Sequence, residues 1–440
     1  MTDQIIARLP PSPTGWFHIG NARTALFNYF FVKKSGGKLL FRLEDTDRER
    51  SRDDYSQDII DGLKWLGLDI DFNSVYKQSE HSETYKKYLS RLIEEGRAYI
   101  SKEEPKEEGQ RAEVIRLKNP GKVVTFQDMI RGDVTVDTTE LGDFVIAKSI
   151  DEPIYHLAVV VDDYEMGVTH VLRGEDGIYN TPRQILIQEA IGAPRPIYAH
   201  LPFILNEDRS KLSKRKQGEL VSLKYYRENG YLPEALVNFL ALTGWNPGGN
   251  DEELLTIEQI IEKFDIHKVQ KGGAVFNKQK LLWTNKEYIK KLPRKSLFEK
   301  VKQRLPEEIT NSHHYSDARL DKILEIITER IHTFGEITQM AEAGEIGYFF
   351  DAPEYDKTLL KSTEFLPETI KLVETLHEDN FTLETVKAAV WDYATEKGRG
   401  QVLWPMRVAL TGKEKSPDPF TVASILGKEE TLLRLNNALS

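Results

Sequence analysis

Hydrophobic and polar positions in the first part of the chain alternate between the periods of strand and helix. The apolar run Gln4–Leu9 is short and stops at Pro10, which predicts a strand. Apolar residues then recur at helical spacing from Gly20 to the glycine pair Gly36-Gly37, where the predicted helix ends. Lys38–Leu43 has a strand pattern again. A strand, a helix and a strand in succession predict a parallel sheet with helices packed on its faces.

Two later changes of pattern predict further domains. Between Gly96 and Tyr155 the chain breaks into short β-prone pieces, which predict an insertion into the α/β domain. These pieces are Val114–Leu117, Val123–Phe126, Val134–Val136 and Phe144–Ile146. Beyond about residue 220 strand signals fade and helical periodicity continues to the end. The predicted parts are a Rossmann-like α/β domain at 1–96 and 151–205, a β-rich insertion at 97–150, a connecting domain at 206–295 and an all-helical region at 296–440.

Composition narrows the class of protein. The 440 residues, 40% of them hydrophobic, suffice for about three domains with sizeable cores. Cysteine is absent, which excludes a disulfide scaffold, a thiolate nucleophile, an iron–sulfur cluster and a cysteine-bound zinc. The amino terminus has no secretory-signal pattern and no stretch could span a bilayer. We therefore expect a cytoplasmic protein without a membrane partner.

Charge is distributed unevenly along this acidic chain. The net charge is −10, yet the segment 268–304 carries twelve Lys or Arg residues against two acids. Aromatic residues lie among these basic ones. Lysines on helices usually form a solvated face, but an excess of this size equally predicts a surface that binds a polyanion. A second basic cluster, 209–216, has five basic residues and no acid.

The first motif that can carry chemistry is Pro11–Asn21, which follows the first predicted strand and opens the first helix. A helix amino terminus offers unpaired N–H groups and positive dipole charge, both of which suit phosphate. His18 and Asn21 can both face a nucleotide from this position, and Gly20 lets a flat ring or a phosphate approach the backbone. Taken alone, the histidine is equally well explained as a helix cap or a packing residue.

The second motif, Lys211–Arg215, lies almost two hundred residues further on. Its two lysines, Lys211 and Lys214, flank Ser213 and make a cationic loop that can hold a triphosphate. An exposed basic loop is the simpler interpretation if the motif stands alone. Together, the two motifs and the interval between them resemble the signature sequences of class I aminoacyl-tRNA synthetases.

Other segments make the resemblance more specific. Their order is similar to that of bacterial glutamyl-tRNA synthetases, and the similarity covers nearly the whole chain. The segments are Arg42–Asp47, Tyr155–Ala158, Val161–Asp163, Met166–Thr169, Arg173–Asp176, Leu232–Leu236 and Arg407–Gly412.

This resemblance implies an ATP-dependent ligase that joins L-glutamate to the 3′ end of tRNA-Glu. The α-carboxylate of glutamate attacks the α-phosphorus of ATP, and a hydroxyl of the terminal tRNA adenosine then attacks the glutamyl adenylate. Pyrophosphate and AMP are released. Mg²⁺ is expected to arrive with ATP, held by the phosphates, with no metal site on the protein and no zinc. The insertion becomes the acceptor-stem-binding part, and 296–440 becomes the anticodon-binding region.

The resemblance also assigns roles to individual residues. His18 stabilises the phosphate in the transition state, and Lys211 and Lys214 hold the β- and γ-phosphates. The implied ATP-binding residues are Pro13, Thr14, Gly15, His18, Gly20, Asn21, Lys211, Ser213 and Lys214. The implied glutamate-binding residues are Arg8, Ser12, Glu44, Tyr155 and Arg173.

Charge complementarity explains the implied glutamate set. A guanidinium matches a carboxylate with two parallel hydrogen bonds, which suits Arg8 and Arg173, and Glu44 suits the α-ammonium. A structural salt bridge is the alternative role for Arg8. Asp45 and Asp47 are equally well explained as helix caps and surface charge. We expect His156 to be a packed strand residue and not a catalyst.

Candidate tRNA contacts come from two regions. Lys290 and Lys291 belong to the basic segment, and Arg330 and Arg407 lie in the helical region. The sequence does not distinguish an enzyme that charges only tRNA-Glu from one that also charges tRNA-Gln. The resemblance implies a monomer.

Other interpretations compete with this one. A glutaminyl-tRNA synthetase, a truncated relative that glutamylates a modified tRNA base, and another nucleotidyl-transferase are the enzymatic alternatives. The segment Glu44–Asp47 and the helical carboxyl-terminal region favour the glutamyl type. An inactive RNA-binding relative is the alternative from another class, and the presence of His18, the motif lysines and the pocket arginines disfavours it.

Overall fold

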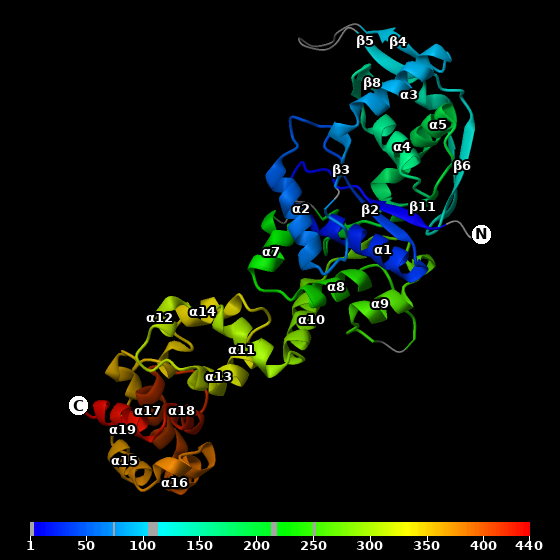
Figure 1. Cartoon of the computed structure of the whole chain (residues 1–440). Coiled ribbons are helices and arrows are strands. Elements are labelled where there is room, and N and C mark those ends of the chain that lie inside the picture. The colour runs from blue at the N-terminus through cyan, green and yellow to red at the C-terminus, as the bar shows by residue number, and fades with distance from the viewer. Residues whose placement is uncertain (1–3, 74, 104–112, 213–217, 250–251) are drawn as a thin grey trace. The chain divides into compact units, whose positions relative to one another are not determined.

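The structure is a computed structural model that describes residues 4–73, 75–103, 113–212, 218–249 and 252–440. The chain forms two compact units (Figure 1). The first comprises Met1–Glu228 and Leu232–Thr284, and the second comprises Asn229–Tyr231 and Asn285–Ser440. None of the helices in the described ranges is long and apolar enough to cross a membrane.

A parallel sheet opens the first unit. β1 (Ile6–Leu9) pairs with β2 (Lys38–Leu43), which pairs with the short β3 (Tyr76–Lys77). Helix α1 (Ile19–Ser35) connects β1 to β2 and packs against both. Gly36 ends the helix in the left-handed conformation, with φ 65°, which costs glycine nothing. The predicted strand–helix–strand unit is confirmed.

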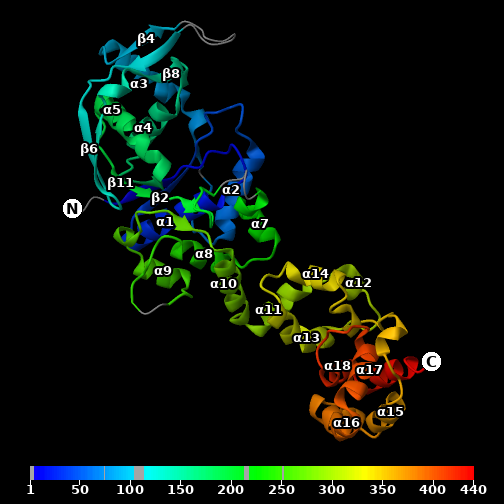
Figure 2. The same ribbon diagram turned by 180° about the vertical axis from the view of Figure 1, so that it is seen from behind.

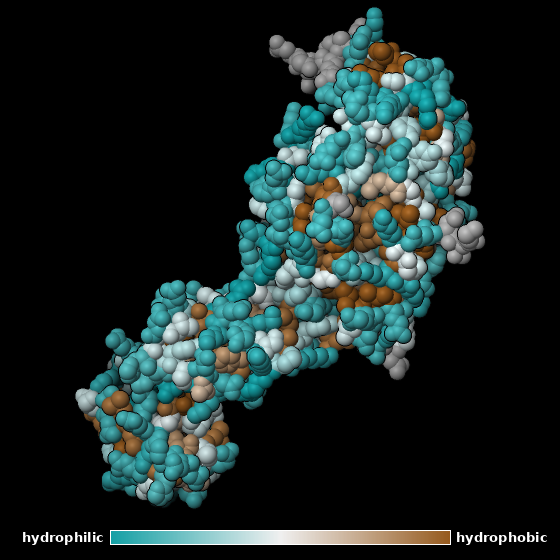
Figure 3. Space-filling view, in the orientation of Figure 1, coloured by the Kyte–Doolittle hydropathy of each residue, from teal (hydrophilic) through white to brown (hydrophobic). Residues whose placement is uncertain are grey.

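Helix α1 is apolar around most of its circumference because it is covered on more than one side. Helices α8 (Pro233–Leu242) and α9 (Ile257–Lys263) pack against it in addition to the sheet. Phe264, just after α9, meets the rings of Phe27 and Phe30 at 5.5 and 5.7 Å between centroids. Figure 2 shows these helices below the strands, and apolar surface gathers over this region in Figure 3.

A second set of parallel strands continues the first. β10 (His170–Gly174) pairs with β11 (Ile197–Leu201), and α5 (Thr181–Ile191) connects them. At the start of β10 the Thr169 N–H donates to the Ile6 carbonyl over 2.9 Å, so β10 lies beside β1. The expected fold class, a Rossmann-like α/β domain, is therefore confirmed.

The predicted β-rich insertion is present and has two parts. One part is an antiparallel sheet of β4 (Ala98–Lys102), β5 (Glu113–Leu117), β8 (Phe144–Ser149) and β9 (Glu152–Pro153). The other is the hairpin of β6 (Val123–Asp128) and β7 (Gly132–Asp137). Strand β6 pairs with β11, with Asp128 opposite Tyr198, so the hairpin extends the parallel sheet. The sequence did not predict this continuity.

Several elements complete the first unit. They are α2 (Asp53–Trp65), α3 (Ser82–Glu94), α4 (Tyr155–Glu165), α7 (Leu223–Glu228) and α10 (Lys278–Lys290), which runs on into the second unit, together with β12 (Ile204–Leu205) and β13 (Ala274–Val275). Strand β13 lies beyond residue 220, where only helices were expected, and its two residues are too few to give a periodic signal. One apolar core joins α3, α4 and α5 to the strands of the insertion.

The second unit is helical, as the periodicity predicted. Its helices are α11 (Arg294–Lys302), α12 (Glu307–Thr310), α13 (Asp317–Arg330), α14 (Glu336–Glu342), α15 (Leu366–Glu374), α16 (Leu383–Lys397), α17 (Arg399–Thr411), α18 (Pro419–Leu426) and α19 (Lys428–Asn437). The division of the first unit at residues 96, 150 and 205 stays a prediction, since the structure separates only the two units.

Candidate functional site

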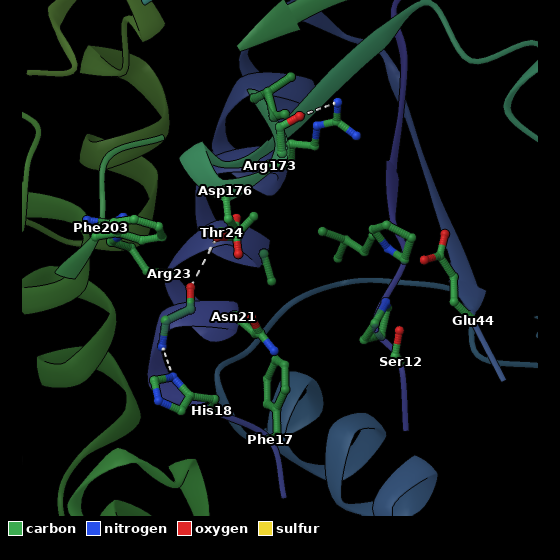
Figure 4. A pocket seen from close by; sticks show the side chains of 18 of the residues that line it. Ser12, Phe17, His18, Asn21, Arg23, Thr24, Glu44, Arg173, Asp176 and Phe203 are labelled. Atoms are coloured by element: carbon green, nitrogen blue, oxygen red, sulfur yellow. Dashed lines mark hydrogen bonds between the residues drawn. The ribbon is translucent and has the colours of Figure 1, made fainter. Parts of the chain in front are cut away.

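Residues at the carboxyl ends of four parallel strands line one cavity. Leu9 ends β1, Glu44 follows β2, Gly174 ends β10 and Pro202 follows β11, and all four border a cavity of about 460 Å³. In open α/β sheets the carboxyl ends of the strands are where ligands bind. Figure 4 shows the cavity from close by, with Glu44 on one side and Phe203 on the other.

The amino terminus of α1 forms one wall of this cavity. His18 is the N-cap of α1, and its Nδ1 accepts a hydrogen bond of 2.9 Å from the Gly20 N–H. A neutral ring bonded in this way carries its proton on Nε2, the donor form that a phosphate oxygen requires. Gly20, Asn21 and Thr14 also line the cavity. Pro13 and Gly15, which were expected to bind ATP, are not among the lining residues.

The lysine motif reaches the same cavity with its first residue. Lys211 lines it, with Nζ 3.8 Å from Asp176 Oδ2 and 3.9 Å from the centroid of the Phe203 ring. Both charged groups of the Lys211–Asp176 pair are more than half exposed, so the pair is weak and can be exchanged for a phosphate. Ser213 and Lys214 lie outside the described residues.

A buried cluster of charged side chains lies directly beneath the cavity. At its centre Arg42, which is fully buried, contacts three acids. Its Nη2 lies 3.0 Å from Glu44 Oε1 and 2.8 Å from Asp163 Oδ1, and its Nε lies 3.8 Å from Asp162 Oδ2. Asp162 also accepts hydrogen bonds from Tyr76, Gln78 and Tyr85. Each buried charge therefore has a partner, without which its burial would be strongly unfavourable.

Arg8 belongs to both the cluster and the cavity. It is 1% exposed, and its Nε donates to Asp163 at 3.2 and 3.3 Å. Its Nη1 is buried and has no hydrogen-bond partner among the described residues. The structural salt bridge that was the alternative role for Arg8 is therefore present, but it uses only one edge of the guanidinium. The other edge is left with donors for a ligand.

The acids around Arg8 and Arg42 differ in their proton affinity. Burial raises the pKa of Glu44, against the opposing pull of Arg42 and Arg8. Burial also acts to raise the pKa of Asp163, but the charges of Arg8 and Arg42 outweigh this effect. The pKa of Asp163 is therefore lowered. Asp163 is accordingly the carboxylate that holds the two arginines. A cation brought next to Glu44 would stabilise its ionised form.

The remaining residues expected to bind glutamate occupy the same cavity. Ser12, Tyr155 and Arg173 line it together with Arg8 and Glu44. Asp45 accepts hydrogen bonds of 2.8 and 2.6 Å from the Ser79 N–H and hydroxyl. Asp47 accepts one of 2.7 Å from Arg50. Neither acid is among the lining residues, which leaves both with local structural roles.

Sequence reasoning missed Arg42, Asp163 and Arg23. Arg42 and Asp163 stood within quoted motifs, but nothing local indicated that a residue of β2 pairs with one of α4. Arg23 lines the cavity one turn after His18 and donates to the carbonyls of Thr243 and Pro202. Burial lowers its pKa to about 10. Its charge among the buried positions of α1, between Ala22 and Ala25, was the available signal.

Comparison with known proteins identifies the family. The family model of class I tRNA synthetases (E and Q), catalytic domain, matches residues 4–109 and 100–283, and that of an anticodon binding domain matches 296–439. The chain belongs to the class I glutamyl and glutaminyl tRNA synthetases. A glutamate–tRNA ligase of Bacillus licheniformis is 39% identical over all of both chains, and one of Thermodesulfovibrio yellowstonii is 40% identical over 98% of each.

A solved structure agrees with these relatives. The glutamate tRNA ligase of Elizabethkingia meningosepticum, determined in complex with its amino acid, has a TM-score of 0.87 and 31% identity over 99% of both chains. The resemblance inferred from the motifs is therefore confirmed. Because the relatives are glutamate–tRNA ligases and the anticodon binding domain is present, the glutaminyl and truncated alternatives are disfavoured.

One expectation about the synthetase is wrong. His156 was expected in a strand, but Tyr155 and His156 begin helix α4. The following residues, Leu157–Val161, are all buried. A helix covered on every side shows no amphipathic period, and its β-branched valines favour a strand in any pattern-based prediction.

The residues expected to contact tRNA have different surroundings. Lys290 forms an ion pair of 2.6 Å with Glu287, whereas Lys291 is exposed and has no ion pair among the described residues. In the second unit Arg330 pairs with Glu345, and Arg407 is partly buried with its Nε unpaired. No group of three or more metal-ligating side chains occurs in the described ranges.

Removing Arg42 is expected to destabilise the first unit strongly. Arg42→Met removes the cation that Glu44, Asp162 and Asp163 share, and loss of one partner from a buried ion pair costs about 3–5 kcal/mol. Arg52→Met is the matched control, because the Arg52 side chain is 61% exposed and its ion pair is with the partly exposed Asp54. That control is expected to cost about 1 kcal/mol or less. Urea unfolding of the full chain measures both, and equal values would show that Arg42 does not hold the cluster.

Proposed function

We propose that this cavity attaches L-glutamate to the 3′ end of tRNA-Glu in an ATP-dependent reaction that passes through glutamyl adenylate. One observation carries the proposal: Arg8, with an unpaired guanidinium edge, borders the same cavity as Glu44 and His18. The first two groups complement an amino acid with two carboxylates and an ammonium. The third, at a helix amino terminus, complements a phosphate.

Glutamate is recognised by charge. Arg8 binds the side-chain carboxylate through its terminal nitrogens, and Glu44 binds the α-ammonium. Ser12 and Tyr155 add neutral hydrogen bonds, and Arg173 adds a second positive charge. Glutamine would leave the edge of Arg8 that faces the cavity without an anionic partner, because Asp163 holds only the Nε edge, at a cost of about 3–5 kcal/mol. That free energy corresponds to about two to three and a half decades in binding.

ATP is held on the opposite wall. His18 donates from Nε2 to the phosphate that is attacked, while Thr14, Gly20 and Asn21 lie around it. Lys211 exchanges its weak contact with Asp176 for the departing pyrophosphate, and Ser213 and Lys214 are expected to assist. Catalysis then consists of positioning and charge stabilisation. Mg²⁺ enters with the phosphates of ATP, and we assign no step to it.

Transfer to tRNA requires contacts beyond the cavity. The insertion is proposed to hold the acceptor stem, the segment 268–304 to attract the phosphate backbone, and residues 296–440 to read the anticodon. Arg330 and Arg407 are the proposed anticodon contacts. Charging of tRNA-Gln as well as tRNA-Glu stays an open alternative. A monomer in the cytoplasm is the expected form of the enzyme.

Removal of Arg8 tests the pocket. Arg8→Ala is expected to raise the KM for glutamate at least about 100-fold, because the side-chain carboxylate loses its charged partner. The KM for ATP should change by less than about threefold. Pyrophosphate exchange with tRNA present measures both constants. Arg195→Ala, which removes an exposed arginine paired with Glu189, is the control.

The exchange assay also tests the activity itself. Exchange that depends on glutamine would indicate a glutaminyl enzyme, and no exchange with cognate tRNA and glutamate would indicate an inactive RNA-binding protein. Glutamate kinetics unchanged in Arg8→Ala would remove Arg8 from the pocket.

Neutralising Lys290 and Lys291 tests the basic segment. The double alanine variant is expected to bind tRNA more weakly, with the slope of log K against log salt reduced by about one to two, since each phosphate contact releases counterions. Lys291 should contribute most, because Lys290 already pairs with Glu287. Filter binding across a salt series measures the slope. Lys371→Ala, an exposed lysine paired with Glu368, is the control, and an unaltered slope would assign both lysines to a solvated face.

A further inference from the structure

Arg173 is held far more tightly than Arg8. Its Nε donates to His200 Nε2 over 3.1 Å, and its Nη1 donates to Gln184 Oε1 over 2.8 Å. Its Nη2 donates to Thr181 Oγ1 over 2.7 Å and to the Gly177 carbonyl over 3.0 Å. Four of its five N–H groups are thereby used. One N–H on Nη1 remains for a ligand, so Arg173 cannot bind a carboxylate in the bidentate manner open to Arg8.

The turn beside Arg173 leaves no space for a side chain at position 177. A Cβ on Gly177 would lie 2.3 Å from Arg173 Nε and 3.0 Å from its Cζ. Only glycine permits the guanidinium to lie against this turn. The acceptors around Arg173 therefore hold its guanidinium in place, and His200 is the acceptor for its Nε–H.

His200 can accept this hydrogen bond only in one tautomer. It is fully buried on β11, and its Nδ1 lies 2.6 Å from Asp128 Oδ2. A carboxylate can only accept, so Nδ1 carries the proton and Nε2 presents a lone pair to Arg173. The Thr181 hydroxyl lies 3.2 Å from Nε2 but donates to the Gly177 carbonyl, which leaves the lone pair to Arg173. Burial lowers the pKa of His200, which favours this neutral form.

The surroundings of Asp128 favour its ionised carboxylate, which can only accept hydrogen bonds. It is 2% exposed and ends β6, and one of its oxygens accepts from the N–H groups of Ile130 and Arg131, both at 2.9 Å. The other accepts from the His200 N–H at 3.0 Å as well as from Nδ1. Every contact comes from a donor. The hairpin of the insertion is thus joined to the cavity by two side chains, Asp128 and His200.

We propose that Asp128 and His200 are positioning residues for amino-acid binding: Asp128 fixes the tautomer of His200, and His200 holds Arg173 in the cavity. The inference rests on the proposed function, since it takes Arg173 as a contact of the bound amino acid. It gives the two arginines different tasks. Arg8 supplies the paired hydrogen bonds, and Arg173 supplies one hydrogen bond of fixed direction.

Two substitutions of His200 separate positioning from general structural support. In His200→Gln, Oε1 can occupy the place of Nε2 and still accept from Arg173, whereas His200→Leu offers no acceptor. Both variants lose the side-chain donor to Asp128 and keep the backbone N–H donor, so any general structural cost is shared. We expect the glutamate KM to rise at least about tenfold in the leucine variant and less than about threefold in the glutamine variant. The KM for ATP should stay within about twofold in both.

The test uses glutamate-dependent pyrophosphate exchange with tRNA, on full-length enzyme. His170→Leu is the matched control, because His170 lies at the opposite end of β10 from Arg173. Equal glutamate KM values in the glutamine and leucine variants would overturn the positioning role. Absence of glutamate-dependent exchange in the wild-type enzyme would instead overturn the proposed function, so the two failures are distinguishable.

A spectroscopic measurement covers the case in which the leucine variant does not fold. In ¹⁵N-histidine-labelled wild-type enzyme, the two-bond ¹H–¹⁵N correlations of His200 should report a protonated Nδ1 and an unprotonated Nε2. Asp128→Asn places an amide where only acceptors are tolerated, which should move the proton to Nε2 and raise the glutamate KM at least about tenfold. A wild-type ring protonated on Nε2, or an unchanged KM in Asp128→Asn, would overturn the proposal.

Discussion

Burial of charge at the carboxyl ends of the central strands is the constraint on which the site depends. Arg8 and Arg42 are removed from water together with Glu44, Asp162 and Asp163. Such groups are stable only when each has a partner at short distance, and the partners come from β1, β2 and α4. The same contacts that satisfy these charges also fix the floor of the cavity. Fold stability and ligand recognition therefore rest on the same contacts.

Arg8 and Arg173 differ in how many of their N–H donors form hydrogen bonds within the protein. Asp163 takes one edge of Arg8 and leaves Nη1 unpaired, while four acceptors surround Arg173. A guanidinium with free donors can adapt to a carboxylate, and one with a single remaining donor can only set direction. Recognition of a small amino acid with two carboxylates benefits from both. His200, in its neutral form, connects Arg173 to Asp128 and so to the hairpin of the insertion.

The basic segment has a more modest electrostatic effect than its composition suggests. Several of its lysines and arginines pair with neighbouring acids, among them Lys280 with Glu253, Arg294 with Asp321 and Lys302 with Asp317. Exposed pairs of this kind are weak, so a polyanion can compete for the cations. The segment then offers an attractive field whose strength depends on salt, and specificity must come from other contacts.

The sequence by itself determined the strand–helix–strand start, the β-rich insertion and the helical second unit, and it indicated that two distant motifs meet at one cavity, which His18 and Lys211 both line. These features depend on periodicity and on turn residues a few positions apart, which a linear pattern records. Only the tertiary structure decided that α4 is a helix, that Arg42 lies at the centre of the charged cluster, and which acid each buried cation meets. Arg8 and Asp163 are 155 residues apart, and His200 and Asp128 are 72 apart. Contacts at such separations arise from the packing of whole elements, which no local spacing specifies.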